Sequence, residues 1–189
     1  MKKTIVICML LLNFSLLNAF DDKREGLLIG LGLGLGSQGM ELSDGTNSVS
    51  EEYSTIATSF KIGYGFSENF TLYYASYVNW YDLEFYSNNG GTFNESMVSG
   101  VAGVGATYFF SENDSFYVSG VIGLGTMAAV DYRWYEIGKG GFISLGYEWK
   151  NRFSIEAVLQ MQTELTSDIN SNLKLKTLSQ QLILQYSWY

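Results

Sequence analysis

Residues 98–126 constrain the fold of this chain more than any other stretch. On both sides of the polar segment 111–115, apolar residues alternate with small or polar ones. A period of two is typical of β-strands, because successive side chains in a strand point to opposite faces of the sheet. The segment 111–115 is rich in residues that form turns. The stretch therefore predicts a β-hairpin with one apolar and one small, polar face, as in a wall between lipid and a barrel interior.

The same alternation recurs along most of the chain. It predicts eight strands joined by three short turns, at 67–69, 111–115 and 150–152, and by four longer loops. Strict alternation of short turns and long loops is expected of outer-membrane barrels. The predicted fold class is all-β, an eight-stranded antiparallel up-and-down transmembrane β-barrel. The predicted loops span residues 37–52, 82–95, 128–139 and 164–173.

Aromatic residues gather at both ends of the predicted strands. Tyr53, Trp80, Tyr132 and Trp134 lie near the loop ends, and a larger group lies at the short-turn end on the predicted outward face. Aromatic rings prefer the headgroup level of a bilayer, so two such belts indicate a membrane barrel. A soluble barrel of the lipocalin kind would need the apolar face to point inward, which these belts disfavour. The predicted periplasmic-side girdle comprises Phe66, Phe70, Phe110, Phe116, Trp149, Phe153 and Trp188.

The first residues predict a secretory signal peptide. Lys2 and Lys3 precede an apolar run that is short for a spanning helix, so we assign residues 1–19 to the signal and 20–189 to the barrel domain. Loss of the two lysines changes the net charge from −8 to −10. An acidic surface argues against nucleic acid as a partner. Secretion and a membrane barrel together predict an integral protein of the Gram-negative outer membrane.

Several kinds of chemistry are excluded by residue content. The chain has no histidine, and its one cysteine, Cys8, lies in the predicted signal. Serine–histidine acyl transfer, histidine-aided proteolysis and histidine or cysteine metal sites are therefore ruled out. Residues 34–39 fit the pattern G-x-G-x-x-G, but no helical period follows, so a dinucleotide site is not indicated. We predict no cofactor, no metal and no enzymatic activity.

Charged residues within the predicted strands are more informative. Lys61, Glu148 and Glu156 fall on the inward face, where unpaired charge is costly. We predict an interior polar cluster of Lys61, Glu148, Glu156 and Gln160. It would either plug the barrel or form a charged constriction in a narrow path. We favour a plug, because eight strands enclose barely more than their own side chains.

Two lysines on the last strand are candidates for lipid contact. Lys174 and Lys176 alternate outward at its upper end, where lipopolysaccharide phosphates would lie, and their ammonium groups would bind such anions. The alternative is an ordinary solvated strand end.

Several motifs resemble the small eight-stranded outer-membrane barrel family of the outer-membrane protein A and protein X type. They are the hairpin GATYFFSEN and FYVSGVIGLG, a second FSEN turn at 66–69, and the aromatic end LILQYSWY. The resemblance covers residues 26–189. It implies a C-terminal strand that engages the barrel-assembly machinery, although Trp188 is in phase with the lipid face and Tyr189 lies one position beyond.

The sequence thus predicts a non-enzymatic outer-membrane barrel that acts through its surface loops, in interaction, adhesion or envelope integrity. Its partners would be outer-membrane lipid, lipopolysaccharide and an extracellular molecule of unknown kind. The alternative is a narrow pore for small solutes, which would need free volume beside the inward tyrosines and glutamines.

Overall fold

The structure, a computed structural model, describes residues 23–43, 48–86, 92–130, 135–150, 152–166 and 174–189. The predicted signal peptide, together with Tyr132 and Trp134, lies outside the described residues, and so does most of the predicted loop 164–173.

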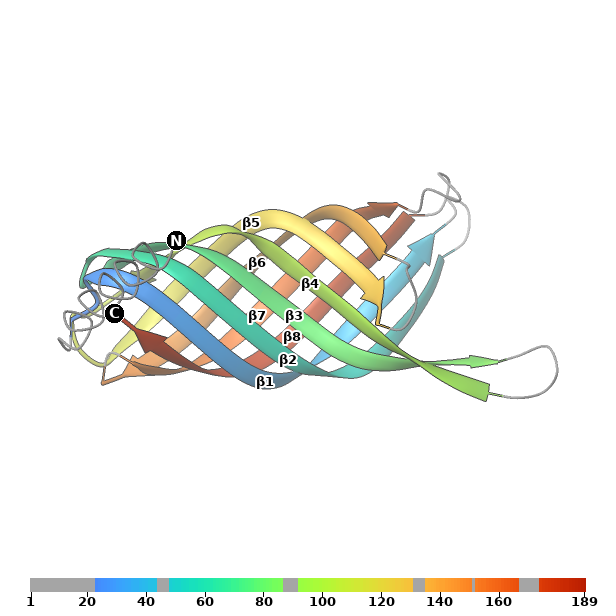
Figure 1. Cartoon of the computed structure of the whole chain (residues 1–189), viewed down its shortest axis with the longest axis horizontal. Helices are drawn as coiled ribbons and strands as arrows, with labels where there is room; N and C mark the ends of the chain where they lie inside the picture. The colour runs from blue at the N-terminus through green and yellow to red at the C-terminus, as the bar shows by residue number, and fades with distance from the viewer. Residues whose placement is uncertain (1–22, 44–47, 87–91, 131–134, 151, 167–173) are drawn as a thin grey trace, which may run out of the picture.

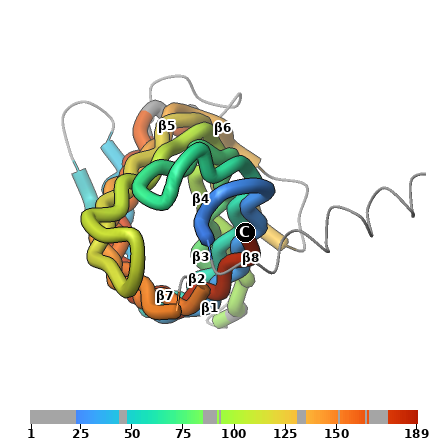
Figure 2. Tube along the Cα trace, turned by 90° about the vertical axis from the view of Figure 1, so that its left-hand side faces the viewer, coloured from blue at the N-terminus to red at the C-terminus, as the bar shows by residue number. Residues whose placement is uncertain are grey.

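Eight strands form a closed barrel within the described residues, and every strand is antiparallel to both neighbours (Figures 1 and 2). The chain closes where the first strand pairs with the last, from Ile29↔Trp188 to Ser43↔Lys174. The predicted fold class is confirmed. The strands are β1 Gly26–Ser43, β2 Ser48–Ser67, β3 Phe70–Tyr86, β4 Thr92–Phe109, β5 Ser115–Ala129, β6 Tyr135–Trp149, β7 Phe153–Thr166 and β8 Lys174–Trp188.

The alternation of the sequence explains how the wall is built. Large apolar side chains point outward and are exposed, for example Leu33 at 63%, Ile122 at 75% and Leu184 at 62%. The residues that alternate with such apolar residues along each strand point inward and are buried, for example Tyr77 and Gln160. An apolar outer face with a polar, filled interior is the arrangement of a barrel in lipid. No helix in the described part of the chain is long and apolar enough to span a membrane.

Three of the predicted loops are wrong in their bounds. In the predicted loop 128–139, residues 128–129 belong to β5 and residues 135–139 to β6. Residues 37–52 and 82–95 belong mostly to strands, because β1 and β2 stay paired up to Ser43↔Ser48, and β3 and β4 up to Tyr86↔Thr92. Here the outward residues change from apolar to polar while the hydrogen-bonded ladder continues. The loss of apolar alternation therefore marks the end of the lipid-facing band and not the end of the strand.

The two ends of the barrel differ. The three short turns lie at one end, which we call the turn end, and the long hairpins lie at the other, which we call the rim. At the rim, the β3–β4 hairpin extends beyond the rest of the wall (Figure 1). This happens because β2 and β3 stop pairing at Ile56↔Trp80, well before β3 and β4 do.

Candidate functional site: the barrel interior

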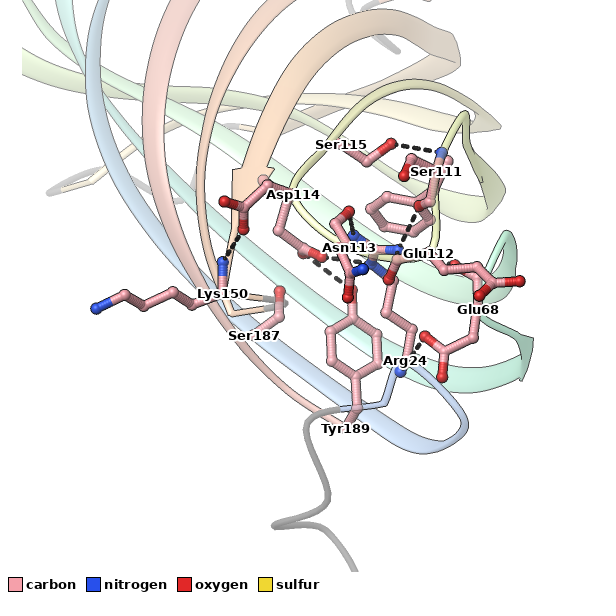
Figure 3. A network of polar contacts seen from close by, with 12 residues as sticks. Arg24, Glu68, Ser111, Glu112, Asn113, Asp114, Ser115, Lys150, Ser187 and Tyr189 are labelled. Carbon is pink, nitrogen blue, oxygen red and sulfur yellow. Dashed lines mark hydrogen bonds and ion pairs between the residues drawn. The ribbon is translucent and has the colours of Figure 1, made fainter.

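Arg24 closes the turn end from within. This residue lies two positions before β1, is fully buried, and its Nε lies 2.6 Å from Oε1 of Glu148. Its guanidinium carbon lies 4.1 Å from the centre of the Phe109 ring. The remaining guanidinium hydrogens are donated to backbone carbonyls of two turns (Figure 3): Nη1 to Glu68 at 2.9 Å, Ser111 at 2.8 Å and Glu112 at 3.1 Å, and Nη2 to Asn113 at 2.8 Å.

The backbone of Arg24 approaches the wall very closely. A Cβ atom on Gly65 would lie 1.6 Å from the carbonyl oxygen of Arg24. Only glycine leaves room for this contact. A residue without a side chain near the end of β2 thus allows the segment before β1 to cross the barrel mouth.

Further contacts join the same network. The hydroxyl of Tyr189, which is buried, donates to Oε2 of Glu148 at 3.2 Å. The backbone N–H of Lys150 donates to Oδ1 of Asp114 at 2.6 Å (Figure 3). Through Arg24, Glu148 and Asp114, the network connects all three short turns.

A second ion pair lies further inside. Nζ of Lys61, on β2, is 3.3 Å from Oε2 of Glu156, on β7. The same carboxylate accepts hydrogen bonds from the hydroxyls of Tyr77, at 2.7 Å, and Ser144. Lys61 and Glu156 are 3% and 0% exposed. Burying a charged pair is tolerated when its geometry is good and its remaining polar atoms are hydrogen-bonded, and here β3 and β6 supply those further partners, Tyr77 and Ser144.

An apolar layer lies beyond this pair. The rings of Tyr77 and Phe142 are 4.3 Å apart at their centres. The layer, which we call the apolar belt, consists of Val101, Val121, Phe142, Val158 and Ile183, all buried in one cluster with Tyr77.

Towards the rim, an uncharged network follows the belt. Ser99 donates to Oε1 of Gln38 at 2.6 Å, and Nε2 of Gln38 donates to Tyr81 at 3.2 Å. A second buried apolar cluster of Tyr81, Leu83, Met97, Met127, Leu165 and Leu175 closes this part of the lumen.

Little room is left beside the ion pairs. A cavity bounded by Lys61, Tyr117 and Glu148, among others, has a volume of about 10 Å³. This is roughly the space that one water molecule needs. The interior at this level is therefore filled by side chains.

The structure places all four residues of the predicted polar cluster inside the barrel, but it does not bring them into one cluster. Lys61 binds Glu156, whereas Glu148 binds Arg24. Gln160 is buried, and neither polar atom of its side chain has a hydrogen-bond partner among the described residues. Arg24 was not predicted, because it precedes the first strand and no local pattern connects it with a carboxylate 124 residues away.

The residues of the predicted girdle lie at the turn end. Phe66, Phe70, Phe110, Phe116 and Phe153 are exposed, at 40% to 61%. Trp149 and Trp188 are half-buried by aromatic neighbours, since Trp149 stacks on Phe153 and Trp188 packs edge-on against Tyr186.

The remaining predicted residues lie on β8. Lys176 is exposed, opposite Glu41 of β1 in the register, and Lys174 begins the strand, opposite Ser43. Across the ranges that the structure describes, no group of three or more acidic, histidine or cysteine residues is placed to hold a metal ion.

Comparison with known proteins identifies the architecture. No family model and no curated protein matches the sequence. The crystal structure of Ail, the attachment invasion locus protein of Yersinia pestis, in complex with the heparin analogue sucrose octasulfate, matches with a TM-score of 0.53 and 11% identity, over 86% of this chain and 99% of Ail. A second Ail structure matches over the same shares, with a TM-score of 0.50 and 15% identity. OprG from Pseudomonas aeruginosa matches with a TM-score of 0.48 and 8% identity, over 89% of this chain and 99% of OprG.

The Ail matches show the fold. The chain has the architecture of the small eight-stranded outer-membrane barrels, as the sequence resemblance implied.

Proposed function

We propose that this protein is an integral outer-membrane barrel that is closed to solutes and acts, without catalysis, through the surface beyond the membrane. The observation that carries the proposal is the filled interior, in which two buried ion pairs, an apolar belt and a second apolar cluster follow one another from the turn end to the rim. Eight strands give a lumen just wide enough for side chains to fill.

The apolar belt argues most strongly against the alternative of a narrow pore. A hydrated ion would have to lose water to pass Phe142 and Val158, whose side chains offer no polar atom to replace it. The residues opposite them in the register, Gln160 and Gln181, are uncharged. The charges of Lys61 and Glu156 neutralise each other and do not line a path.

The outer surface of the barrel supports contacts with the membrane. The exposed apolar face and the aromatic girdle fit lipid on all sides. Lys174 and Lys176 remain our candidates for binding lipopolysaccharide phosphates, and β8 remains the candidate strand for the barrel-assembly machinery.

The rim is where a partner outside the cell would bind. Ail was crystallised with a polyanionic heparin analogue. Here the rim carries Glu51, Glu52, Asp82 and Glu84, all exposed. We infer that the partner of this chain is positively charged, because a negatively charged partner would be repelled by these carboxylates.

The test is the conductance of the refolded barrel in a planar bilayer. Folding is verified first by the heat-modifiable migration of the protein in a gel, and a known porin in the same membranes verifies the sensitivity. We expect no discrete current steps, either from the native protein or from Glu156→Gln. Discrete steps from the native protein, with an ion selectivity that shifts in Glu156→Gln, would establish the pore instead.

A further inference from the structure

The wall of the barrel splits at the rim between β2 and β3. The two strands pair from Ser67↔Phe70 to Ile56↔Trp80. Beyond that point, residues 48–55 of β2 pair only with β1, and residues 81–86 of β3 pair only with β4. Each segment therefore keeps one edge of backbone N–H and C=O groups that no described strand pairs, and such edges accept further strands. We call the space between these two edges the notch.

The sequence explains why the two strands separate. If their register continued, Ser54 would lie opposite Asp82, and Glu52 opposite Glu84. Like charges directly opposite each other destabilise an antiparallel pair. No lysine or arginine occurs in residues 48–60, 76–86 or 92–98 to offset them. Repulsion between Glu52 and Glu84 thus opposes closure of the wall here.

The bottom and inner side of the notch are well defined. The rings of Tyr53 and Tyr81 stack at 5.6 Å between centres, just above the last pair of the β2–β3 ladder. On the inner face of the β3–β4 hairpin, Leu83 lies opposite Glu95. Glu95 is 7% exposed, and its Oε1 has no hydrogen-bond partner among the described residues. Because Glu95 lies on the inner face while Glu52 and Glu84 are exposed on the outward face, the charge that would select a cationic segment is that of Glu52 and Glu84.

We propose that the notch binds an extended, positively charged polypeptide segment as an added strand. Such a strand would satisfy the free backbone edge of β2 or β3, as in other cases of strand addition. Its side chains would alternate, so that lysines or arginines on the outward face would lie beside Glu52 and Glu84 while apolar residues face Leu83. This inference rests on the proposed function and names the class of partner that the rim accepts.

The probe for this proposal is an eight-residue peptide of alternating lysine and valine, which matches a short strand. Its binding to the refolded barrel in detergent micelles is measured by fluorescence anisotropy. Two matched peptides accompany it: one with glutamate in place of lysine, and one with alternate backbone amides N-methylated. We expect the first peptide to bind at least about tenfold more tightly than either of the others, because both charge and backbone donors are required.

Two variants then test the site itself. Glu52→Lys places a cation opposite Glu84 and should close the notch, so that binding of the lysine peptide falls by about tenfold or more. Glu52→Lys combined with Glu84→Lys restores repulsion with the opposite sign and should shift the preference to the glutamate peptide. Glu25→Lys, which makes the same charge change at the turn end, is the control and should leave binding unchanged.

The outcomes separate this inference from the proposed function. Absence of binding to a folded native barrel would overturn the notch as a site. Equal binding of the N-methylated peptide, or equal loss in Glu25→Lys, would show charge attraction alone and overturn it as well. Either result leaves the closed lumen standing, because conductance tests the lumen independently.

Discussion

The turn end and the rim of this barrel both contain glutamates, but the wall is closed at the turn end and split at the rim. At the turn end, Glu148 is buried against Arg24, and the turns supply carbonyls to the same guanidinium. At the rim, Glu52 and Glu84 are exposed on neighbouring strands that separate instead of pairing. A glutamate that is paired with a cation thus helps to hold the barrel end closed, whereas two glutamates without a cation between them keep neighbouring strands apart.

The largest effect is expected from loss of that cation. Arg24→Ala leaves Glu148 buried without its partner, which typically costs about 3–5 kcal/mol. We expect the free energy of unfolding to fall by this order, as measured by urea unfolding of the refolded barrel with tryptophan fluorescence. Arg24→Ala with Glu148→Gln should recover part of the loss, since the unpaired charge is removed. A loss below about 1 kcal/mol in the single variant would show that the pair of Arg24 and Glu148 is not what stabilises the closed turn end.

A smaller effect is expected from crowding the same mouth. Gly65→Ala would place a methyl group against the carbonyl of Arg24 and should destabilise the barrel by about 1–3 kcal/mol, the usual range for overpacking. Faster amide exchange at residues 23–28, measured by mass spectrometry, should accompany the change. Gly120→Ala is the matched control, because its nearest neighbour, the carbonyl oxygen of Phe142, lies 4.0 Å from the added atom. Equal losses in both variants would contradict a specific role for Gly65.

The smallest effect concerns the rim. Glu52→Lys should extend the β2–β3 ladder and add about 0.2–1 kcal/mol, the typical value of a favourable cross-strand pair. Amide exchange should become slower within residues 48–55 and 81–86. The control Glu25→Lys makes the same charge change before β1, at the turn end, and should leave those amides unprotected. If Glu52→Lys also leaves the exchange of those amides unchanged, repulsion between Glu52 and Glu84 is not what separates the strands.

Much of the architecture could be predicted from local pattern. The alternation of apolar with small or polar residues within each predicted strand indicated which side chains point inward, and it placed Lys61, Glu148 and Glu156 in the lumen before any pairing was known. Strand ends could not be predicted in the same way. Polar residues at 37–43 and 48–52 resemble a loop in composition, yet their backbones stay hydrogen-bonded in β1 and β2.

The partners of the charged residues were also beyond local pattern. Lys61 and Glu156 are brought together by closure of the barrel, and the sequence offers both glutamates equally to Lys61. The choice depends on Arg24, whose position is set by Gly65 and by the turn carbonyls. Such contacts join residues far apart in the chain and become visible only in three dimensions.

The freestanding β3–β4 hairpin has a consequence for how the chain can change. Because its outer part pairs only with itself, from Leu83↔Glu95 to Tyr86↔Thr92, its length is uncoupled from the shear of the barrel. Adding residues in matched pairs to both strands would preserve the phase of every inward and outward side chain. The hairpin is therefore the place where this scaffold tolerates insertion, and where foreign sequences could be displayed without disturbing the membrane-embedded wall.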